Sequence, residues 1–241
     1  MQRASEKKRA LLRQKWRDLL FIHWEAPAEL VQKSLPRGLF VDTFEGRAYW
    51  GVVPFTMRSL RPAGLPAVPM ISDFYELNLR TYVMDDRGRP GVWFYSLDAD
   101  SWISVKIARA FFHLPYELAE FSFERREGGD VFYRSLAARD DEKIEMGYGV
   151  CVRGRAKRAA LGSLEAFLVE RYRLYAYDAK KRRLLTGTLR HEPYEICDAE
   201  ALEYSKRLFP LNGFGEPGGG PVSVLYSKGV DVEVFGIEKV E

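Results

Sequence analysis

Apolar and polar side chains alternate in short segments along most of this chain, and that pattern predicts many β-strands. Most of these segments are rich in aromatic and β-branched residues, and turns with glycine, proline or charged residues separate them. The predicted strands are "FIHWE" and "GRAYWGVVPFTM", followed by residues 74–84, 91–97, 116–123, 131–137, 144–153, 171–177, 184–191, 223–226 and 231–235. Residues 74–84 and 91–97 flank the turn "DDRGRPG", which predicts a β-hairpin.

Helical spacing is limited to a few short segments. Within residues 1–20 an N-terminal helix is expected, because apolar residues share one face opposite arginine and lysine: Leu12, Trp16, Leu19 and Leu20. Further short helices are expected in "APAELVQKSLP", in residues 104–114, and in two segments with N-caps at their first residue, Ser163–Val169 and Asp198–Leu208. Many strands with few short helices favour a single β-rich domain over residues 1–241, closed or nearly closed.

The strand "FYELNLRTYV" is the most informative element, because side chains alternate between the two faces of a strand. One face is mainly apolar and is expected to join the core. The other face carries an acid, an amide, a guanidinium and a phenol among its residues: Phe74, Glu76, Asn78, Arg80 and Tyr82. Neighbours on that face are about 7 Å apart, so a small polar ligand could contact two or three of them. The alternative is that this face is solvated, as on the outer side of a half-buried sheet.

A second group of polar residues follows in "SVKIARAFFHLPYELAEF". Apolar residues recur there at helical spacing up to Leu114, and Pro115 disfavours helix at that residue. The alternation of a strand then resumes. If its parity holds through the corner, Glu117 is buried and either has a partner, for which Arg80 and Arg109 are candidates, or stays protonated. If the corner breaks the alternation, Glu117 is exposed.

Composition and charge narrow the class of protein. Hydrophobic residues make up 46% and charged residues 29% of the 241 residues, as in ordinary globular proteins. The net charge of +3 is too small to indicate a nucleic-acid partner, and no apolar run is long enough to span a membrane. Cys151 and Cys197 form neither a disulfide framework nor a CxxC pair, and no signal peptide is recognised. A cytoplasmic location with free thiols is therefore expected.

Other candidate motifs fail the test of their structural context. The segment "GFGEPG" matches G-x-G-x-x-G but follows no predicted strand and opens no helix, so a glycine-rich loop, which could cover a cavity, is expected instead of a dinucleotide site. His23, His113 and His191 show no metal-ligand spacing, and neither a metal nor another cofactor is expected. The basic runs "RGRAKR" and "KKRR" lack interleaved aromatic residues, so nucleic-acid binding is not expected.

Several segments, in a fixed order, resemble the uncharacterised DUF2071 family, also called the YqjF-like family. They are "WRDLLFIHW", "SLPRGLFVDTFEGRAYWGVVPF", "FYELNLRTYV", "PGVWFYSLDAD", "ARAFFHLPYELA" and "FLVERYRLYAYD", and the resemblance runs from about Trp16 to about Pro193. That family is similar in fold to acetoacetate decarboxylase. The resemblance therefore implies a β-rich α+β fold, with an antiparallel barrel-like sheet, an internal cavity and a few peripheral helices.

Two segments resemble the decarboxylase itself. The strand "FYELNLRTYV" is similar to a decarboxylase strand that places a glutamate in the cavity, and Glu76 stands at that acid. The segment "ARAFFHLPYELA" resembles a run with an arginine, a Gly-x-Pro and two successive lysines, with Arg109 at the arginine and Pro115 at the proline. The first lysine forms the Schiff base in the decarboxylase, and the second lowers its pKa. Tyr116 and Glu117 stand at those positions here, so imine chemistry is not expected.

These residues leave more than one function open. The candidate catalytic residues are Glu76, Tyr116 and Glu117. The candidate ligand-binding residues are Asn78, Arg80, Tyr82 and Arg109. Together they would suit a small ligand that bears a carboxylate or oxo group and is expected to be anionic, with acid–base chemistry of a lyase, hydratase or isomerase type. The alternatives are a binding protein without catalysis and a protein-interaction module on the same scaffold, and a homo-oligomer is compatible with each.

Overall fold

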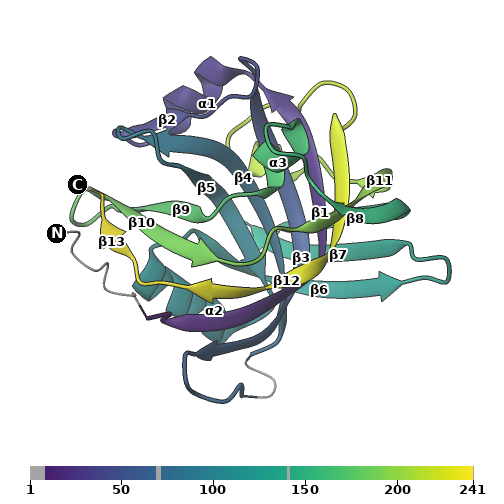
Figure 1. The fold of residues 1–241 in the computed structure, drawn as a ribbon, viewed down its shortest axis with the longest axis horizontal. Coiled ribbons are helices and arrows are strands. Elements are labelled where there is room, and N and C mark those ends of the chain that lie inside the picture. The colour runs from purple at the N-terminus through teal and green to yellow at the C-terminus, as the bar shows by residue number, and fades with distance from the viewer. Residues whose placement is uncertain (1–8, 69–71, 140–141, 241) are drawn as a thin grey trace.

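The computed structural model describes residues 9–68, 72–139 and 142–240 as a β-rich fold with short peripheral helices (Figure 1). Its strands are β1 (Leu12–Ala26), β2 (Leu39–Val41), β3 (Ala48–Pro62), β4 (Phe74–Asp85), β5 (Pro90–Ala99), β6 (Tyr116–Arg125), β7 (Val131–Arg139), β8 (Glu142–Arg158), β9 (Arg173–Asp178), β10 (Arg183–Arg190), β11 (Glu195–Tyr204), β12 (Ser223–Val234) and β13 (Glu238–Lys239). Its helices are α1 (Ala28–Ser34), α2 (Trp102–Ile107), the π-helix η1 (Ala108–Phe112), α3 (Leu164–Val169) and α4 (Leu208–Leu211).

The strands form one sheet that closes on itself through two extra pairings, β10–β12 and β4–β5. We call the circuit β12-β1-β3-β4-β5-β9-β10 the first ring, and the circuit β5-β6-β7-β8-β11-β12-β1-β3-β4 the second ring. Most neighbours are antiparallel, whereas β5 runs parallel to both β6 and β9. The expected barrel-like sheet is confirmed, although its closure is uneven because some of these contacts involve only two residue pairs.

Strand β4 belongs to the wall that the two rings share, and it is buried on both faces. Phe74 and Tyr82 join the apolar core of the first ring. Leu77 and Leu79, on the opposite face, join the core of the second ring. The polar face of "FYELNLRTYV" is therefore enclosed and not solvated, which decides between the two alternatives that the alternation left open.

The N-terminal helix predicted within residues 1–20 is wrong where the structure describes the chain, from residue 9 onward. Those residues lead into β1, which lies between β12 and β3. Asp18 has a φ of +54°, and the register with β3 shifts between Arg17 and Ile22. This kink interrupts the alternation, so that Trp16 and Leu19, three residues apart, both pack against the core of the first ring. A kinked strand thus reproduces the apolar spacing of a helix.

The helix predicted over Asp198–Leu208 is also wrong for most of its length. The segment belongs to β11 up to Tyr204, and only α4 is helical at its end. Ala, Glu and Leu favour helices in isolation, but β11 pairs with β8 across the sheet. Ion pairs reinforce that pairing, with Lys157 Nζ 3.1 Å from Asp198 Oδ2 and Arg153 Nη2 2.8 Å from Glu200 Oε2. Tertiary pairing therefore overrides the local propensity.

The other predicted helices are confirmed. Helix α1 begins after Pro27, and α3 begins after Ser163, whose side chain accepts a hydrogen bond from the Ala166 N–H at 3.2 Å. The helix expected in residues 104–114 is present as α2 followed by η1. In the described part of the chain, no helix is long and apolar enough to cross a membrane.

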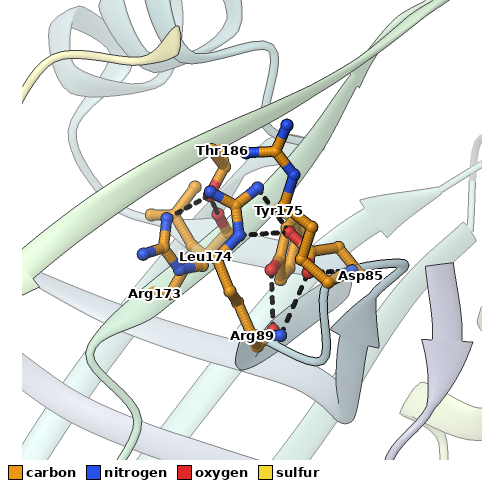
Figure 2. Close-up of polar contacts among 7 residues, drawn as sticks. Asp85, Arg89, Arg173, Leu174, Tyr175 and Thr186 are labelled. Carbon is orange, nitrogen blue, oxygen red and sulfur yellow. Dashed lines mark hydrogen bonds and ion pairs between the residues drawn. The ribbon is translucent and has the colours of Figure 1, made fainter. Parts of the chain in front are cut away.

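A polar cluster joins the turn between β4 and β5 to strands β9 and β10, where the first ring closes (Figure 2). Asp85 accepts a hydrogen bond from Arg89 Nε at 2.6 Å, and the Tyr175 hydroxyl donates to the Arg89 carbonyl oxygen at 2.7 Å. On the neighbouring strands, Arg173 donates to the Thr186 hydroxyl at 3.2 Å. These bonds support the short parallel contact between β5 and β9 and so help to hold the wall of the interior in place.

Candidate active site

The first ring encloses a cavity of about 130 Å³ between its strands and the α2–η1 segment. Among the described residues, four lining side chains are polar: Gln14, Glu76, Ser104 and Tyr116. The remaining lining residues are apolar, and aromatic rings from several strands stand among them, including Trp16, Phe55 and Phe94. Ile107 lines the cavity and is 47% exposed, so the cavity approaches the surface on the side of α2.

Glu76 and Tyr116 form a hydrogen-bonded pair in this cavity. The Tyr116 hydroxyl donates to Glu76 Oε2 at 2.7 Å, and Asn78 Nδ2 donates to Oε1 at 3.3 Å. Strand β5 brings the pair together, since it pairs Ala99 with Glu76 on one side and Leu97 with Tyr116 on the other. Both side chains are buried, with Glu76 only 3% exposed.

Burial has the largest effect on the pKa values of Glu76 and Tyr116. It raises the pKa of Glu76 to about 7, even though hydrogen bonds from Tyr116 and Asn78 and the charge of Arg80 act in the opposite direction. Burial also raises the pKa of Tyr116 well above its ordinary value, and the neighbouring Glu76 adds to that rise. Glu76 can therefore exchange a proton near neutral pH, whereas Tyr116 keeps its proton and acts as a hydrogen-bond donor.

The α2–η1 segment forms one wall of the cavity and leads directly to Tyr116. Ser104, Ala108 and Phe112 line the cavity from this segment. The π-helix ends at Phe112, and the next residue, His113, has a φ of +52°. The chain then passes Pro115, whose carbonyl oxygen accepts a hydrogen bond from the Leu97 N–H at 3.1 Å. A π-helical turn of this kind is frequent at functional sites, and here it sets the position at which β6 begins.

Arg109 and Glu117 lie outside the cavity, which corrects the prediction that both belong to the site. They form an ion pair, with 2.6 Å between Arg109 Nη2 and Glu117 Oε2, and about half of each side chain is exposed. Tyr116 is buried at the start of β6, whereas the next two residues, Glu117 and Leu118, are both exposed, so the corner breaks the alternation and leaves Glu117 at the surface. Arg109 Nε also donates to the Tyr116 carbonyl oxygen at 2.5 Å, so Arg109 braces the backbone of a site residue from outside.

Arg80 and Tyr82 are buried on the same face of β4 as Glu76 but form a separate cluster. Both donate to the Leu168 carbonyl oxygen, Arg80 Nη2 at 3.1 Å and the Tyr82 hydroxyl at 2.8 Å. The Arg80 guanidinium lies over the ring of Phe21, with 5.5 Å to the centroid. Neither residue lines the cavity, so the sequence was right about their face and wrong in joining them to one ligand site with Glu76.

Several interior polar residues are not predicted by the sequence pattern. Gln14 and Ser104 line the cavity, but the pattern predicts a helix at Gln14 and gives no signal of a site at Ser104. His23 is fully buried and lies 2.7 Å from the Tyr82 hydroxyl through Nε2, and burial lowers its pKa well below the usual range. The parity of "FIHWE" could have placed His23 on the same face as Phe21, but the pattern gives no sign of its partner.

Two other features considered in the sequence, a metal site and the glycine-rich segment, can be compared with the structure. No group of three or more histidine, cysteine, aspartate or glutamate residues in the described ranges is placed to hold a metal ion. The segment "GFGEPG" follows α4 as a loop, and Phe214 within it packs against Trp50 in the core of the second ring. That loop is not among the segments that line the cavity, so it does not cover it.

Comparison with known proteins places the chain in a family. The model of DUF2071, an uncharacterized conserved protein, matches residues 13–231. The chain belongs to the DUF2071 family. It is 34% identical over 229 residues to the uncharacterized protein YqjF of Bacillus subtilis (strain 168), an alignment that covers 95% of this chain and 92% of YqjF.

Solved structures show the fold that this DUF2071 protein shares with others. Acetoacetate decarboxylase from Legionella pneumophila matches with a TM-score of 0.69 and 15% identity, over 100% of this chain and 92% of the decarboxylase. The enduracididine biosynthesis enzyme MppR, complexed with pyruvate, matches with a TM-score of 0.67 and 10% identity, over 99% of this chain and 93% of MppR. An acetoacetate decarboxylase-like enzyme from Sphingomonas wittichii RW1 matches with a TM-score of 0.64 and 16% identity, over 97% and 94% of the chains. The expected similarity in fold to acetoacetate decarboxylase is confirmed.

Proposed function

We propose that this protein binds a small oxo-bearing organic molecule in the cavity of the first ring and acts on it by acid–base chemistry at Glu76 and Tyr116. The observation that carries the proposal is the buried Glu76 carboxyl, which faces an apolar cavity, bonds to a phenol and has a pKa raised to about 7. Environments that shift the pKa of a carboxyl toward neutrality are typical of general acids and bases. The fold likeness to enzymes, one of them complexed with pyruvate, supports the same class of ligand.

The reaction that suits these groups is proton transfer beside a carbonyl. The Glu76 carboxylate would take a proton from the carbon next to the oxo group, and the electron pair of that C–H bond would form the C=C bond of an enolate. Tyr116 would turn its hydroxyl from Glu76 to the oxo oxygen, where the negative charge develops. Return of the proton from Glu76 to carbon completes the cycle. Lysine is not found among the described lining residues, which supports a mechanism without an imine.

Deuterium exchange tests this proposal directly. We expect the protein in D₂O to exchange the protons beside the carbonyl of at least one of two probes, 2-pentanone and pyruvate, as followed by ¹H NMR. Glu76→Gln should abolish the exchange, and Tyr116→Phe should slow it by about 100-fold, a usual contribution of a positioned acid or base. Glu117→Gln is the matched control, because it removes a neighbouring carboxylate that lies outside the cavity, and it should retain the wild-type rate. Exchange at the wild-type rate in Glu76→Gln would contradict the proposal.

Binding without catalysis is the second candidate, and one observation favours it. Both Glu76 oxygens already accept hydrogen bonds from within the protein, from Tyr116 and Asn78. A carboxylate held in this way serves to fix the shape and polarity of a binding cavity. Saturable binding of a probe, without any exchange that depends on Glu76, would support this second function and exclude the first.

A further inference from the structure

We infer that the cavity takes an uncharged ligand, a ketone, aldehyde or ester oxygen on a short apolar chain, and discriminates against carboxylates. This inference rests on the proposed function for the identity of the site, and it narrows the class of substrate. It also reverses the expectation from the sequence that the ligand is anionic.

The lining suits a neutral molecule. Apart from Gln14, Glu76, Ser104 and Tyr116, every described residue that lines the cavity is apolar. Ser104 Oγ accepts a hydrogen bond from the Ser101 hydroxyl at 2.9 Å, which leaves the proton of Ser104 available to a ligand oxygen. The polar groups can therefore donate to an oxo oxygen, while the rest of the wall contacts an apolar chain.

A carboxylate in this cavity would meet an unfavourable balance of charge. A buried anion needs a cation or several strong donors, because it loses its hydration. The lining residues that the structure describes include no lysine or arginine, and Glu76 itself is an acid. When Glu76 is ionised, a ligand carboxylate would add a second negative charge beside it.

The two arginines that the sequence suggested as anion clamps do not supply the missing charge. Arg109 is on the outer side of η1 and already pairs with Glu117. Arg80 is buried, but its guanidinium bonds to the Leu168 carbonyl oxygen and lies over Phe21. Its charge acts on Glu76, whose pKa it lowers, so one buried cation is already balanced by one buried acid.

The volume limits the size of the ligand. An apolar cavity of roughly 150 Å³ is known to accept benzene, so the 130 Å³ here corresponds to a molecule of about six non-hydrogen atoms. That size fits 2-pentanone. Butanoate is its charged counterpart, with an oxygen in place of the methyl group beside the carbonyl, so the two compounds match in size and shape and differ in charge.

The test compares the binding of 2-pentanone and butanoate to the full chain at pH 8, where Glu76 is largely ionised, by ligand-observed NMR titration. We expect 2-pentanone to bind with a dissociation constant at least about tenfold below that of butanoate, because the carboxylate loses its hydration without gaining a cation. Ala108→Leu fills the cavity from η1 and should remove the binding of 2-pentanone. Ala110→Leu is the matched control, because Ala110 is exposed on the same segment and does not line the cavity.

The outcomes separate this inference from the proposed function. Butanoate binding that equals or exceeds that of 2-pentanone, and is lost in Ala108→Leu, would overturn the uncharged class while leaving the acid–base proposal intact. The absence of saturable 2-pentanone binding, or its persistence in Ala108→Leu, would overturn the inference as well. Selective binding of 2-pentanone without deuterium exchange that depends on Glu76 would support the ligand class and overturn the catalytic proposal.

Discussion

At the scale of single residues, the protein places an ionisable carboxyl where water is largely excluded. Glu76 is 3% exposed, and burial raises its pKa to about 7 from an ordinary value of 4.5. The folded state therefore holds the Glu76 proton more tightly than the unfolded state does. Stability associated with this group is fully present below pH 4.5 and is lost as the pH rises through about 7.

This linkage predicts how Glu76→Gln should change stability with pH. A shift of this size corresponds to about 3 kcal/mol, so the free energy of unfolding of the wild type should fall by that amount relative to Glu76→Gln between pH 4.5 and pH 7.5. Urea denaturation of both proteins across that range measures the difference. The difference is informative because the other titrating groups are common to both proteins. A gap that stays constant with pH would mean that Glu76 does not have a raised pKa in the folded protein.

The same residue scale shows what the sequence could predict about the site. Alternation placed Glu76 and Arg80 on one face of a strand, and the structure confirms that face as interior. Alternation does not predict the direction of a long side chain within its face. The Arg80 guanidinium donates to the Leu168 carbonyl oxygen and does not line the cavity. The misplaced Glu117 has a different cause, because the corner at the start of β6 leaves both Glu117 and Leu118 exposed, although Ala119 on the face of Glu117 is buried.

At the scale of elements, β1 shows why local patterns fail. The kink at Asp18 shifts the alternation of side chains. Before the kink Trp16 faces the core of the first ring, and after it Leu19 and Phe21 face the same core. The partner strand adapts at Gly229, which has a φ of +131° and pairs with Arg17. A period that changes within one strand has no local signal, and only pairing with β3 and β12 reveals it.

Gly229→Ala should therefore be strongly destabilising. A Cβ at this position would press on the Trp16 backbone oxygen, closer than any van der Waals contact, and the residue would keep a φ that side chains rarely adopt. We expect the free energy of unfolding to fall by roughly 3 kcal/mol or more. Backbone strain at the positive φ and the steric clash of the new Cβ both contribute to this loss. Gly236→Ala is the control, since its added Cβ would meet nothing within 4 Å. Chemical denaturation of both variants measures the effect, and similar stabilities would show that β1 and β12 can separate at the kink without cost.

At the scale of the whole molecule, the two rings share a wall, and each ring needs it. Strands β12, β1, β3, β4 and β5 belong to both circuits, so the cores on either side of that wall are built on the same strands. The sequence pattern predicts a β-rich, nearly closed fold, because it shows many strands and few short helices. It could not predict two rings, because the evidence lies in pairings such as β10–β12 and β5–β9, which join distant segments through only two residue pairs each. The near-continuous burial of β4 follows from this arrangement, because a strand in a wall shared by two rings has no water-facing side.

The shared wall predicts that the chain unfolds in one cooperative step. Trp16 packs against the core of the first ring and Trp50 lies in the core of the second, so each reports on one ring. With every tryptophan replaced by 5-fluorotryptophan, ¹⁹F NMR follows both positions in a single urea titration, and single Trp→Phe variants assign the signals. We expect the native signals of Trp16 and Trp50 to disappear with the same midpoint, because loss of either core removes the wall on which the other is built. Two separate midpoints would show that the rings are independent folding units and that the shared strands are stable with one core alone.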